Sequence, residues 1–156
     1  MGLEIERKFL VTGDGWKSAA HAVRHLRQGY LALDESTNVR VRTDGERAWL
    51  TIKAKGEGIS RPEFEYEIPA AEAAPLLQLC RGRTVEKMRH LVSRDGLTWE
   101  VDEFLGENAG LVLAELELDR PDQDFRRPAW VGEEVSADHR YHNANLALHP
   151  YARWPR

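Results

Sequence analysis

Charged side chains at every second position mark the segment EIERKFLV near the start of the chain. Glu4, Glu6 and Lys8 alternate there with other residues, among them the apolar Ile5 and Phe9. Side chains two apart share one face of a β-strand, so two carboxylates and one ammonium would point the same way. Carboxylates bind divalent cations and ammonium groups bind phosphates. The segment therefore predicts a strand with one face suited to charged ligands.

The same alternation recurs along six further segments, and in each the charged face carries a single sign. The basic faces hold Arg40 with Arg42, Lys53 with Lys55, and Lys87 with Arg89, and the acidic faces hold Glu63 with Glu65 and Glu67, Glu100 with Asp102, and Glu115 with Glu117. A solvated sheet face has the same period, but it usually mixes residue types because neighbouring like charges repel. Sorting by sign indicates compensation, either between strands of opposite charge or by a ligand of both signs, such as a divalent metal on a polyanion.

Eight segments have the alternation expected of β-strands. They are 3–11, 25–33, 38–43, 47–55, 62–68, 84–93, 97–105 and 111–118. Asp-Gly pairs at 44–45 and 95–96 predict tight hairpins, so neighbouring strands should run antiparallel. Short helices are expected at 14–23, 70–80 and 143–148.

These elements predict an α+β chain that is mostly β: a closed eight-stranded antiparallel β-barrel, or tunnel, with a charged interior and a few short peripheral helices. About eight strands close around a bore wide enough for side chains or one small ligand. The charged faces would line the bore, and the apolar faces would pack outward against the helices. Arg and Lys would then bind phosphoryl oxygens, while carboxylates would hold Mg²⁺ or Mn²⁺.

Composition limits the classes of partner. A chain of 156 residues with 42% hydrophobic content predicts one domain, residues 1–156. The net charge of -4 provides no overall attraction for nucleic acid or anionic lipid. Cys80 is the single cysteine, and no segment has the roughly 20 apolar residues of a membrane span. We expect a cytoplasmic protein without a nucleic-acid or membrane partner, and a homodimer is left open.

The chain resembles the CYTH family, also called triphosphate tunnel metalloenzymes, over nearly its whole length. Glu4-x-Glu6-x-Lys8 looks like the ExExK signature of that family, and RQGYL, VRVR, TIKAK, RPEFEYEI, VEKMR, EVDEF, AELEL and EEVSADHRYHNANLA follow in the family's order. A lone ExExK is a weak motif, whereas eight further elements in order are specific. The family includes inorganic triphosphatases, thiamine triphosphatases and class IV adenylyl cyclases, so the resemblance implies an eight-stranded tunnel that hydrolyses or transfers a triphosphate.

The resemblance also implies roles for individual charged residues. By position, the phosphate-binding bases are Lys8, Arg40, Arg42, Lys53, Lys87 and Arg89, and the metal-binding acids are Glu4, Glu6, Glu115 and Glu117. Glu63, Glu65 and Asp102 stand where the family has further acids that position a second metal or the attacking water. Glu100 shares the face of Asp102 and is expected to support it.

Catalysis in such a tunnel would consist mainly of positioning and charge stabilisation. The bases would hold the triphosphate along the bore, and a metal held by the glutamates would bridge phosphoryl oxygens. A carboxylate or a second metal would activate water, and Lys53, hydrogen-bonded to Tyr30, would assist the departing group. His142 stands where family members often have a lysine; because histidine is only partly charged at neutral pH, no role is assigned to it.

Hydrolysis of inorganic tripolyphosphate, a small-molecule triphosphate, is the expected function, because the predicted site recognises phosphates and nothing in the sequence indicates a base pocket. A class IV adenylyl cyclase that converts ATP to cyclic AMP and pyrophosphate is one alternative. A thiamine triphosphatase is another. A non-catalytic module that binds polyphosphate or nucleotide is the alternative from a different class.

Overall fold

Nine strands and several short helices make up residues 2–155, which are the residues that this computed structural model describes. The strands are β1 (Gly2–Val11), β2 (Ala22–Leu33), β3 (Thr37–Thr43), β4 (Ala48–Ala54), β5 (Ser60–Ile68), β6 (Thr84–Arg94), β7 (Leu97–Phe104), β8 (Val112–Glu117) and β9 (Val131–Glu134). The α-helices are α1 (Gly15–Ala19), α2 (Ala73–Leu79) and α3 (Asn143–Leu148), and the 3-10 helices are η1 (Ala70–Glu72), η2 (Gly106–Asn108), η3 (His139–Tyr141) and η4 (Tyr151–Arg153). Within this part of the chain no helix is both long and apolar enough to cross a membrane.

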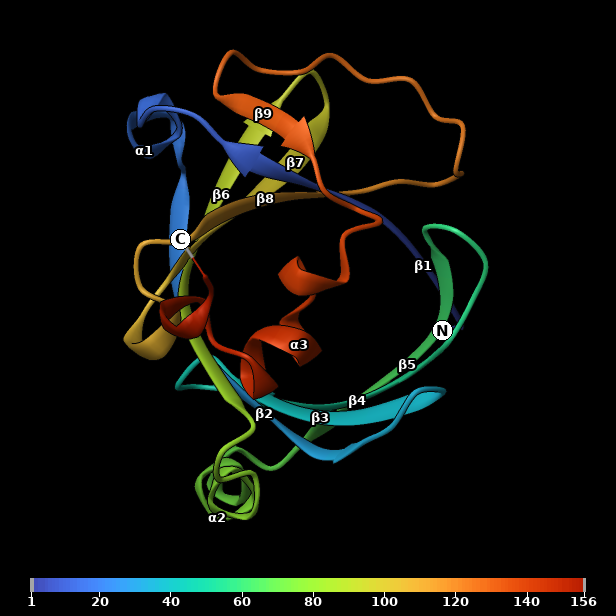
Figure 1. The fold of residues 1–156 in the computed structure, drawn as a ribbon, viewed down its shortest axis with the longest axis vertical. Helices are drawn as coiled ribbons and strands as arrows, with labels where there is room; N and C mark the ends of the chain where they lie inside the picture. Colours follow the sequence, from blue (N-terminus) through green and yellow to red (C-terminus); the bar gives the residue numbers. More distant parts are fainter. Residues whose placement is uncertain (1, 156) are drawn as a thin grey trace.

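Eight of the strands close into an antiparallel barrel, as predicted. Their order is β5-β4-β3-β2-β6-β7-β8-β1, and β5 pairs again with β1 to close the ring. β1 makes this closure possible because its first residues pair with β5 and its later ones with β8. The hairpin between β6 and β7 turns at Asp95 and Gly96, whose φ angles of 53° and 78° lie in the left-handed region that Asp-Gly tolerates. Figure 1 shows the ring of strands, with α3 inside it.

Two elements differ from the sequence-based expectation. β9 was not predicted. It has only four residues and pairs with the C-terminal end of β1, where Gly132 brings its backbone close to Leu10. The helix expected at 14–23 is shorter, because the chain from Ala22 onward joins β2. Both differences arise from pairing with strands that are distant in sequence.

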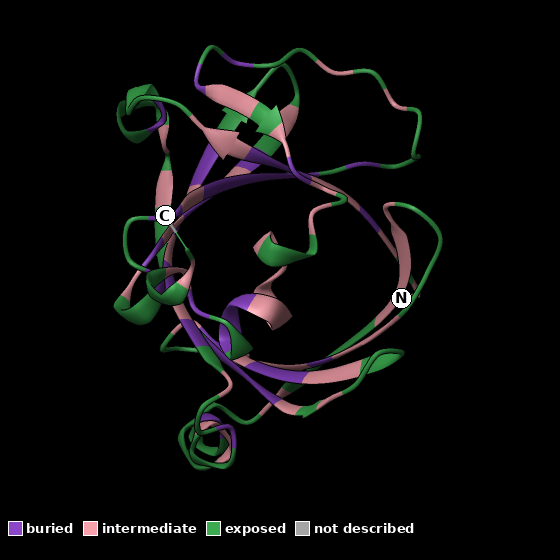
Figure 2. Cartoon of the chain, in the orientation of Figure 1, coloured by how far each residue is buried: buried purple, intermediate pink, exposed green. Residues whose placement is uncertain are grey.

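The barrel has one apolar core outside its wall and another inside. The outer core packs the outward side chains of β1, β6, β7 and β8, including Phe9, Trp99 and Leu116, under α1 and β9. The inner core joins inward side chains such as Phe104 and Leu113 to Leu146 of α3. Figure 2 shows buried stretches along β6 and β8 and again on α3. The C-terminal segment thus closes one end of the lumen.

Candidate active site

The inward faces of β1, β6, β7 and β8 change from apolar to charged along the barrel. The apolar layer holds Leu10, Val85, Phe104 and Leu113; the next layer holds Lys8, Lys87, Asp102 and Glu115; the last holds Glu6, Arg89, Glu100 and Glu117. Leu146 of α3 packs on the apolar layer, which we call the closed end. Glu117 is exposed, so the opposite, charged end is open to solvent. The lumen is therefore a blind tunnel.

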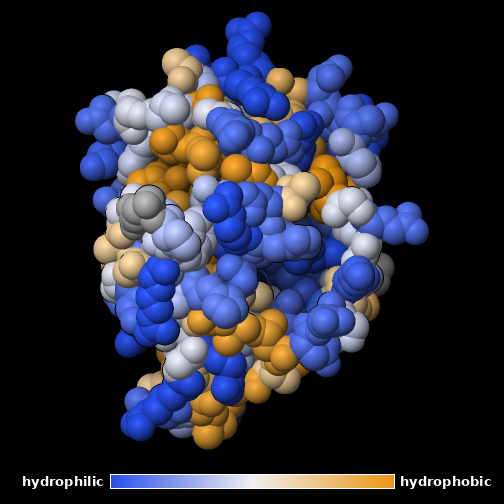
Figure 3. Space-filling view, viewed as in Figure 1, coloured by the Kyte–Doolittle hydropathy of each residue, from blue (hydrophilic) through white to orange (hydrophobic). Residues whose placement is uncertain are grey.

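A cavity of about 270 Å³ occupies the charged part of the lumen. Its lining consists of Glu4, Glu6, Arg40, Arg42, Lys53, Glu63, Glu65, Arg89, Glu100, Glu115, Glu117 and Asn143. Every lining residue except Asn143 carries an ionisable side chain. Figure 3 shows hydrophilic side chains around the hollow on this face of the molecule. Such a cavity suits a small, multiply charged ligand.

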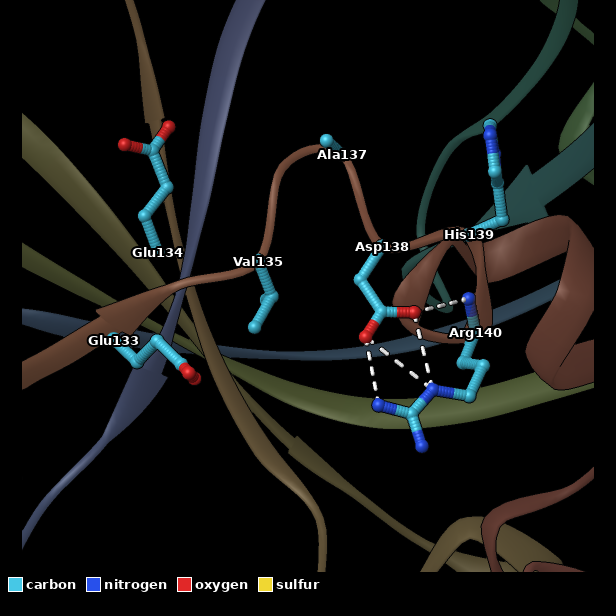
Figure 4. A pocket seen from close by; sticks show the side chains of 7 residues that line it. All are labelled: Glu133, Glu134, Val135, Ala137, Asp138, His139 and Arg140. Carbon is cyan, nitrogen blue, oxygen red and sulfur yellow. Dashed lines mark hydrogen bonds and ion pairs between the residues drawn. The ribbon is translucent and has the colours of Figure 1, made fainter.

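A larger hollow, of about 620 Å³, lies along β9 and the turn that follows it. Figure 4 shows its lining, in which Arg140 forms ion pairs with Asp138. Glu134 is likewise paired with Arg7 across 2.5 Å. Three charged side chains of this hollow are thus already paired, Asp138 with Arg140 and Glu134 with Arg7 of β1, and the barrel cavity is the stronger candidate site.

A buried ion cluster separates the apolar core from the cavity. Both oxygens of Asp102 bind the Arg89 guanidinium, at 2.8 and 2.9 Å, and Oδ2 also contacts Lys87 Nζ at 2.7 Å. Lys8 Nζ lies 3.2 Å from Glu115, which also contacts Arg89. Burial alone would raise the pKa of Glu115, but Lys8 and Arg89 hold it well below its usual range. Paired charges thus form a rigid floor for the cavity.

Acids are concentrated without full compensation at the open end. Glu6 stands directly opposite Glu117 on the neighbouring strand. Burial, together with the charges of Glu115 and Glu4, raises the pKa of Glu6 to about 7. Burial and the charge of Glu4 also raise the pKa of Glu117. An added cation would relieve this repulsion.

The acidic group has the right donor chemistry for a metal, although its side chains are not arranged as a finished site. Carboxylate oxygens are the ligands that Mg²⁺ and Mn²⁺ prefer. Across residues 2–155, no three Asp, Glu, His or Cys side chains are gathered closely enough to hold a metal ion. Glu4 is instead paired with Lys53 Nζ at 2.9 Å. The residues fit a metal by type, and binding would require Glu4 to leave Lys53.

Three guanidinium groups face the acids across the cavity. Arg40 contacts Thr51 Oγ1 at 3.4 Å, and that hydroxyl donates to Glu65 at 3.2 Å. Burial, with Arg40 and Arg89 nearby, lowers the pKa of Arg42 to about 9. A bound polyanion would stabilise arginines whose mutual repulsion lowers the pKa in this way.

The structure brings most of the predicted site residues to the cavity and places four elsewhere. Lys8, Lys87 and Asp102 lie in the buried ion cluster, behind the cavity lining. Because both oxygens of Asp102 are engaged by Arg89 and Lys87, its arrangement favours a positioning role rather than metal ligation. Tyr30 packs in the inner apolar core, and no hydrogen bond joins it to Lys53 in the described chain.

Sequence reasoning missed three polar residues of the site. Asn143 lines the cavity from α3 and accepts a hydrogen bond from Lys87 at 3.1 Å. Thr51 links Arg40 to Glu65, and Gln28 holds Arg42. The period of two places Thr51 on the face of Lys53 and Gln28 on that of Tyr30, so alternation could have identified both. No strand pattern could have placed Asn143, which belongs to a helix.

Comparison with known proteins is consistent across sequence and structure. The CYTH domain family model matches residues 2–149. An inorganic triphosphatase of Acetivibrio thermocellus is 51% identical over 97% of each chain, and one of Nitrosomonas europaea is 43% identical over 93% of this chain and 97% of its own. A crystal structure of an inorganic triphosphatase has a TM-score of 0.67 and 39% identity, over 93% of this chain and 94% of the other.

Proposed function

The chain belongs to the CYTH domain family, and on that premise we propose that it is a metal-dependent triphosphatase that cleaves inorganic tripolyphosphate to pyrophosphate and phosphate. Two inorganic triphosphatases that align with nearly the whole chain support this function. The structural observation that carries it is the cavity whose wall combines three arginines with a group of glutamates. A phosphate chain bound to a divalent cation matches both signs of charge.

The basic side chains bind and orient the substrate. Arg40, Arg42 and Arg89 donate to phosphoryl oxygens, so the chain of phosphates lies along the cavity with its terminal phosphorus toward the acids. Glu65, held by Thr51, orients the attacking water, with Glu63 two residues away on the same face, and accepts its proton at a carboxylate oxygen. Lys53 Nζ donates a proton to the leaving pyrophosphate oxygen.

The acids of the open end, together with Glu115 of the buried ion cluster, would hold the metal. CYTH triphosphatases depend on divalent metals in general, and Glu4, Glu6, Glu115 and Glu117 supply carboxylate oxygens here. A bound Mg²⁺ or Mn²⁺ would neutralise phosphoryl charge in the transition state. Glu6 and Glu117 are the most suitable ligands, because no described residue forms a hydrogen bond or an ion pair with either carboxylate.

Several broader properties complete the proposal. Residues 1–156 form one CYTH domain that acts in the cytoplasm on a small-molecule triphosphate, without a nucleic-acid partner, and a homodimer is compatible with it. Adenylyl cyclase activity has less support: a candidate adenylate cyclase of Bacillus halodurans, at 18% identity and a TM-score of 0.59, shares the fold alone. The cavity lining contains no apolar or aromatic side chain to receive a nucleobase, as far as residues 2–155 show.

A substrate panel tests the proposal. Purified protein is offered tripolyphosphate, thiamine triphosphate or ATP with Mg²⁺, Mn²⁺ or EDTA, and phosphate and cyclic AMP are measured together. We expect metal-dependent phosphate release that is fastest from tripolyphosphate. Arg42→Gln should lower kcat/KM at least about tenfold, whereas Arg47→Gln, at an exposed arginine paired with Glu67, should not change it. Cyclic AMP as the main product, or no turnover with either metal, would overturn the proposal.

A further inference from the structure

Gln28 is a fully buried polar residue directly behind the cavity wall. It lies on β2 opposite Arg42 of β3 and has no exposed surface. Its Oε1 accepts a hydrogen bond of 2.9 Å from Arg42 Nε. Arg42 itself lines the cavity, whereas Gln28 does not. The amide therefore holds the guanidinium on the side away from the ligand space.

This contact leaves the terminal nitrogens of Arg42 free for a ligand. Among the described residues, Nε is the one atom of the Arg42 guanidinium that takes part in a hydrogen bond or ion pair. A guanidinium is planar, so fixing Nε also fixes the directions of the two terminal nitrogens. They provide the fork of donors that matches two oxygens of one phosphoryl group.

The neutrality of the amide matters as much as its position. Asp102 and Glu115 surround Arg89 with negative charge, while within residues 2–155 the Arg42 guanidinium has a single hydrogen-bond partner, the uncharged carbonyl of the Gln28 amide. A carboxylate at position 28 would give the same hydrogen bond but would cancel the charge of Arg42. The cavity thus keeps an arginine that is held in place without being neutralised.

We propose that Gln28 is a positioning residue that aims Arg42 at a phosphoryl group of the substrate while leaving the Arg42 guanidinium without a carboxylate in direct contact. The inference rests on the proposed triphosphatase function. It deepens that function by distinguishing Arg42, which a neutral amide holds, from Arg89, which acids hold. The difference assigns substrate recognition to Arg42 and a structural share to Arg89.

The amide nitrogen of Gln28 suggests a substitution that tests this proposal. Its Nε2 is buried and has no hydrogen-bond partner in the described chain. Methionine has nearly the same length and shape and no amide. Gln28→Met therefore removes the hydrogen bond to Arg42 together with an unsatisfied donor, but it also leaves Arg42 Nε without its acceptor, so the variant should fold with a melting temperature somewhat below that of the wild type.

Steady-state kinetics with tripolyphosphate and Mg²⁺ tests the proposal in a double-mutant cycle. We expect Gln28→Met to raise KM about tenfold with kcat within about twofold, because the contact of Arg42 is made in both ground and transition states. Gln28→Glu should raise KM more, by about a hundredfold, because it also cancels a charge. In an Arg42→Lys background, which lacks Nε, Gln28→Met should change KM less than about twofold.

Three outcomes would overturn the inference. They are a folded Gln28→Met with the KM of the wild type, an equal effect of Gln28→Met in the Arg42→Lys background, or an unchanged KM in Gln28→Glu. If Gln28→Met does not fold, Gln28→Glu carries the test, because it keeps the acceptor oxygen. Wild-type protein that neither hydrolyses tripolyphosphate nor binds it in a calorimetric titration would instead refute the proposed function, so the two failures are distinguishable.

Discussion

The two ends of the barrel interior lie on the same strands but bury their side chains in opposite ways. At the closed end, Phe104 and Leu113 pack against Leu146 without any charge among them. At the open end, four residues from Leu10 on β1 and from Leu113 on β8, Glu6 stands opposite Glu117 and the acids repel one another. Apolar burial at one end stabilises the fold, so the other end can hold charge that only a ligand would compensate.

The layer between the two ends explains how such different environments coexist. Asp102 and Lys87 are completely buried, but each charge in this layer has an opposite partner within hydrogen-bond distance. A paired layer separates the uncompensated charges from the apolar core. Variants in the three layers should therefore affect activity and stability in different proportions.

The largest expected effect is on activity at the open end. Glu6→Gln should reduce metal-dependent turnover about a thousandfold, because it removes a charged oxygen from the metal-binding acids. Its melting temperature should not fall, because the substitution relieves repulsion from Glu4 and Glu115. Glu4→Gln should lose activity similarly. Phosphate release measures the loss of activity, and thermal denaturation of the same variants measures the melting temperature.

Glu67→Gln is the matched control for these two variants, since Glu67 is an exposed glutamate paired with Arg47. It should retain full activity. Undiminished turnover in both Glu4→Gln and Glu6→Gln would remove the metal-binding role from the open end.

A change in the middle layer should lower stability and activity together. Asp102→Asn leaves Lys87 and Arg89 without their shared counter-charge and should cost about 3–5 kcal/mol in the free energy of unfolding. Arg89 also lines the cavity, so kcat/KM should fall. Chemical denaturation measures the free energy of unfolding, and steady-state kinetics measures kcat/KM. Glu103→Gln, one residue along on the outward face, should leave both nearly unchanged, and an equal loss there would contradict the layered arrangement.

A change at the closed end should affect stability more than chemistry. Leu146 is fully buried in the inner core, so Leu146→Ala should destabilise the fold by about 2–5 kcal/mol and lower the melting temperature by about 5–15 °C. Below the melting transition, kcat should stay within a fewfold of the wild type. A variant that melts normally yet loses its turnover would show that α3 serves the reaction more than the packing.

The smallest expected effect concerns His142, which precedes α3. Burial lowers its pKa to about 4, although Nε2 donates to the Ser136 carbonyl. In the unfolded chain the pKa returns to about 6.5, so between these values the unfolded state binds more protons and stability falls as the pH decreases. Because the ring is only partly buried, the loss should be about 1–2 kcal/mol between pH 7 and pH 4.

His142→Asn should reduce this pH dependence, since asparagine can donate to the same carbonyl without titrating. Urea denaturation of both proteins at pH 7 and pH 4.5 measures it. An identical loss in wild type and variant would assign the pH dependence to other groups.

The eight barrel strands could be predicted because alternation is a local property. A period of two puts Glu4, Glu6 and Lys8 on one face whatever the strand pairs with. Asp95-Gly96 likewise specifies its turn through its own backbone conformation. Separation of the charges by sign was also visible, and it indicated correctly that these faces point toward one another.

Depth along the lumen was decided only by the tertiary structure. Lys87 and Arg89 share a face and a sign, yet Arg89 lines the cavity while Lys87 lies behind it against Asn143. Tyr30 also faces inward, as the period of two requires, but it does not reach the cavity because it packs in the inner core with Leu146 of α3. Which inward residue meets a ligand depends on strand register and on a helix that begins 56 residues after Lys87 in the sequence and further still from Tyr30, and alternation along one strand carries no information about either.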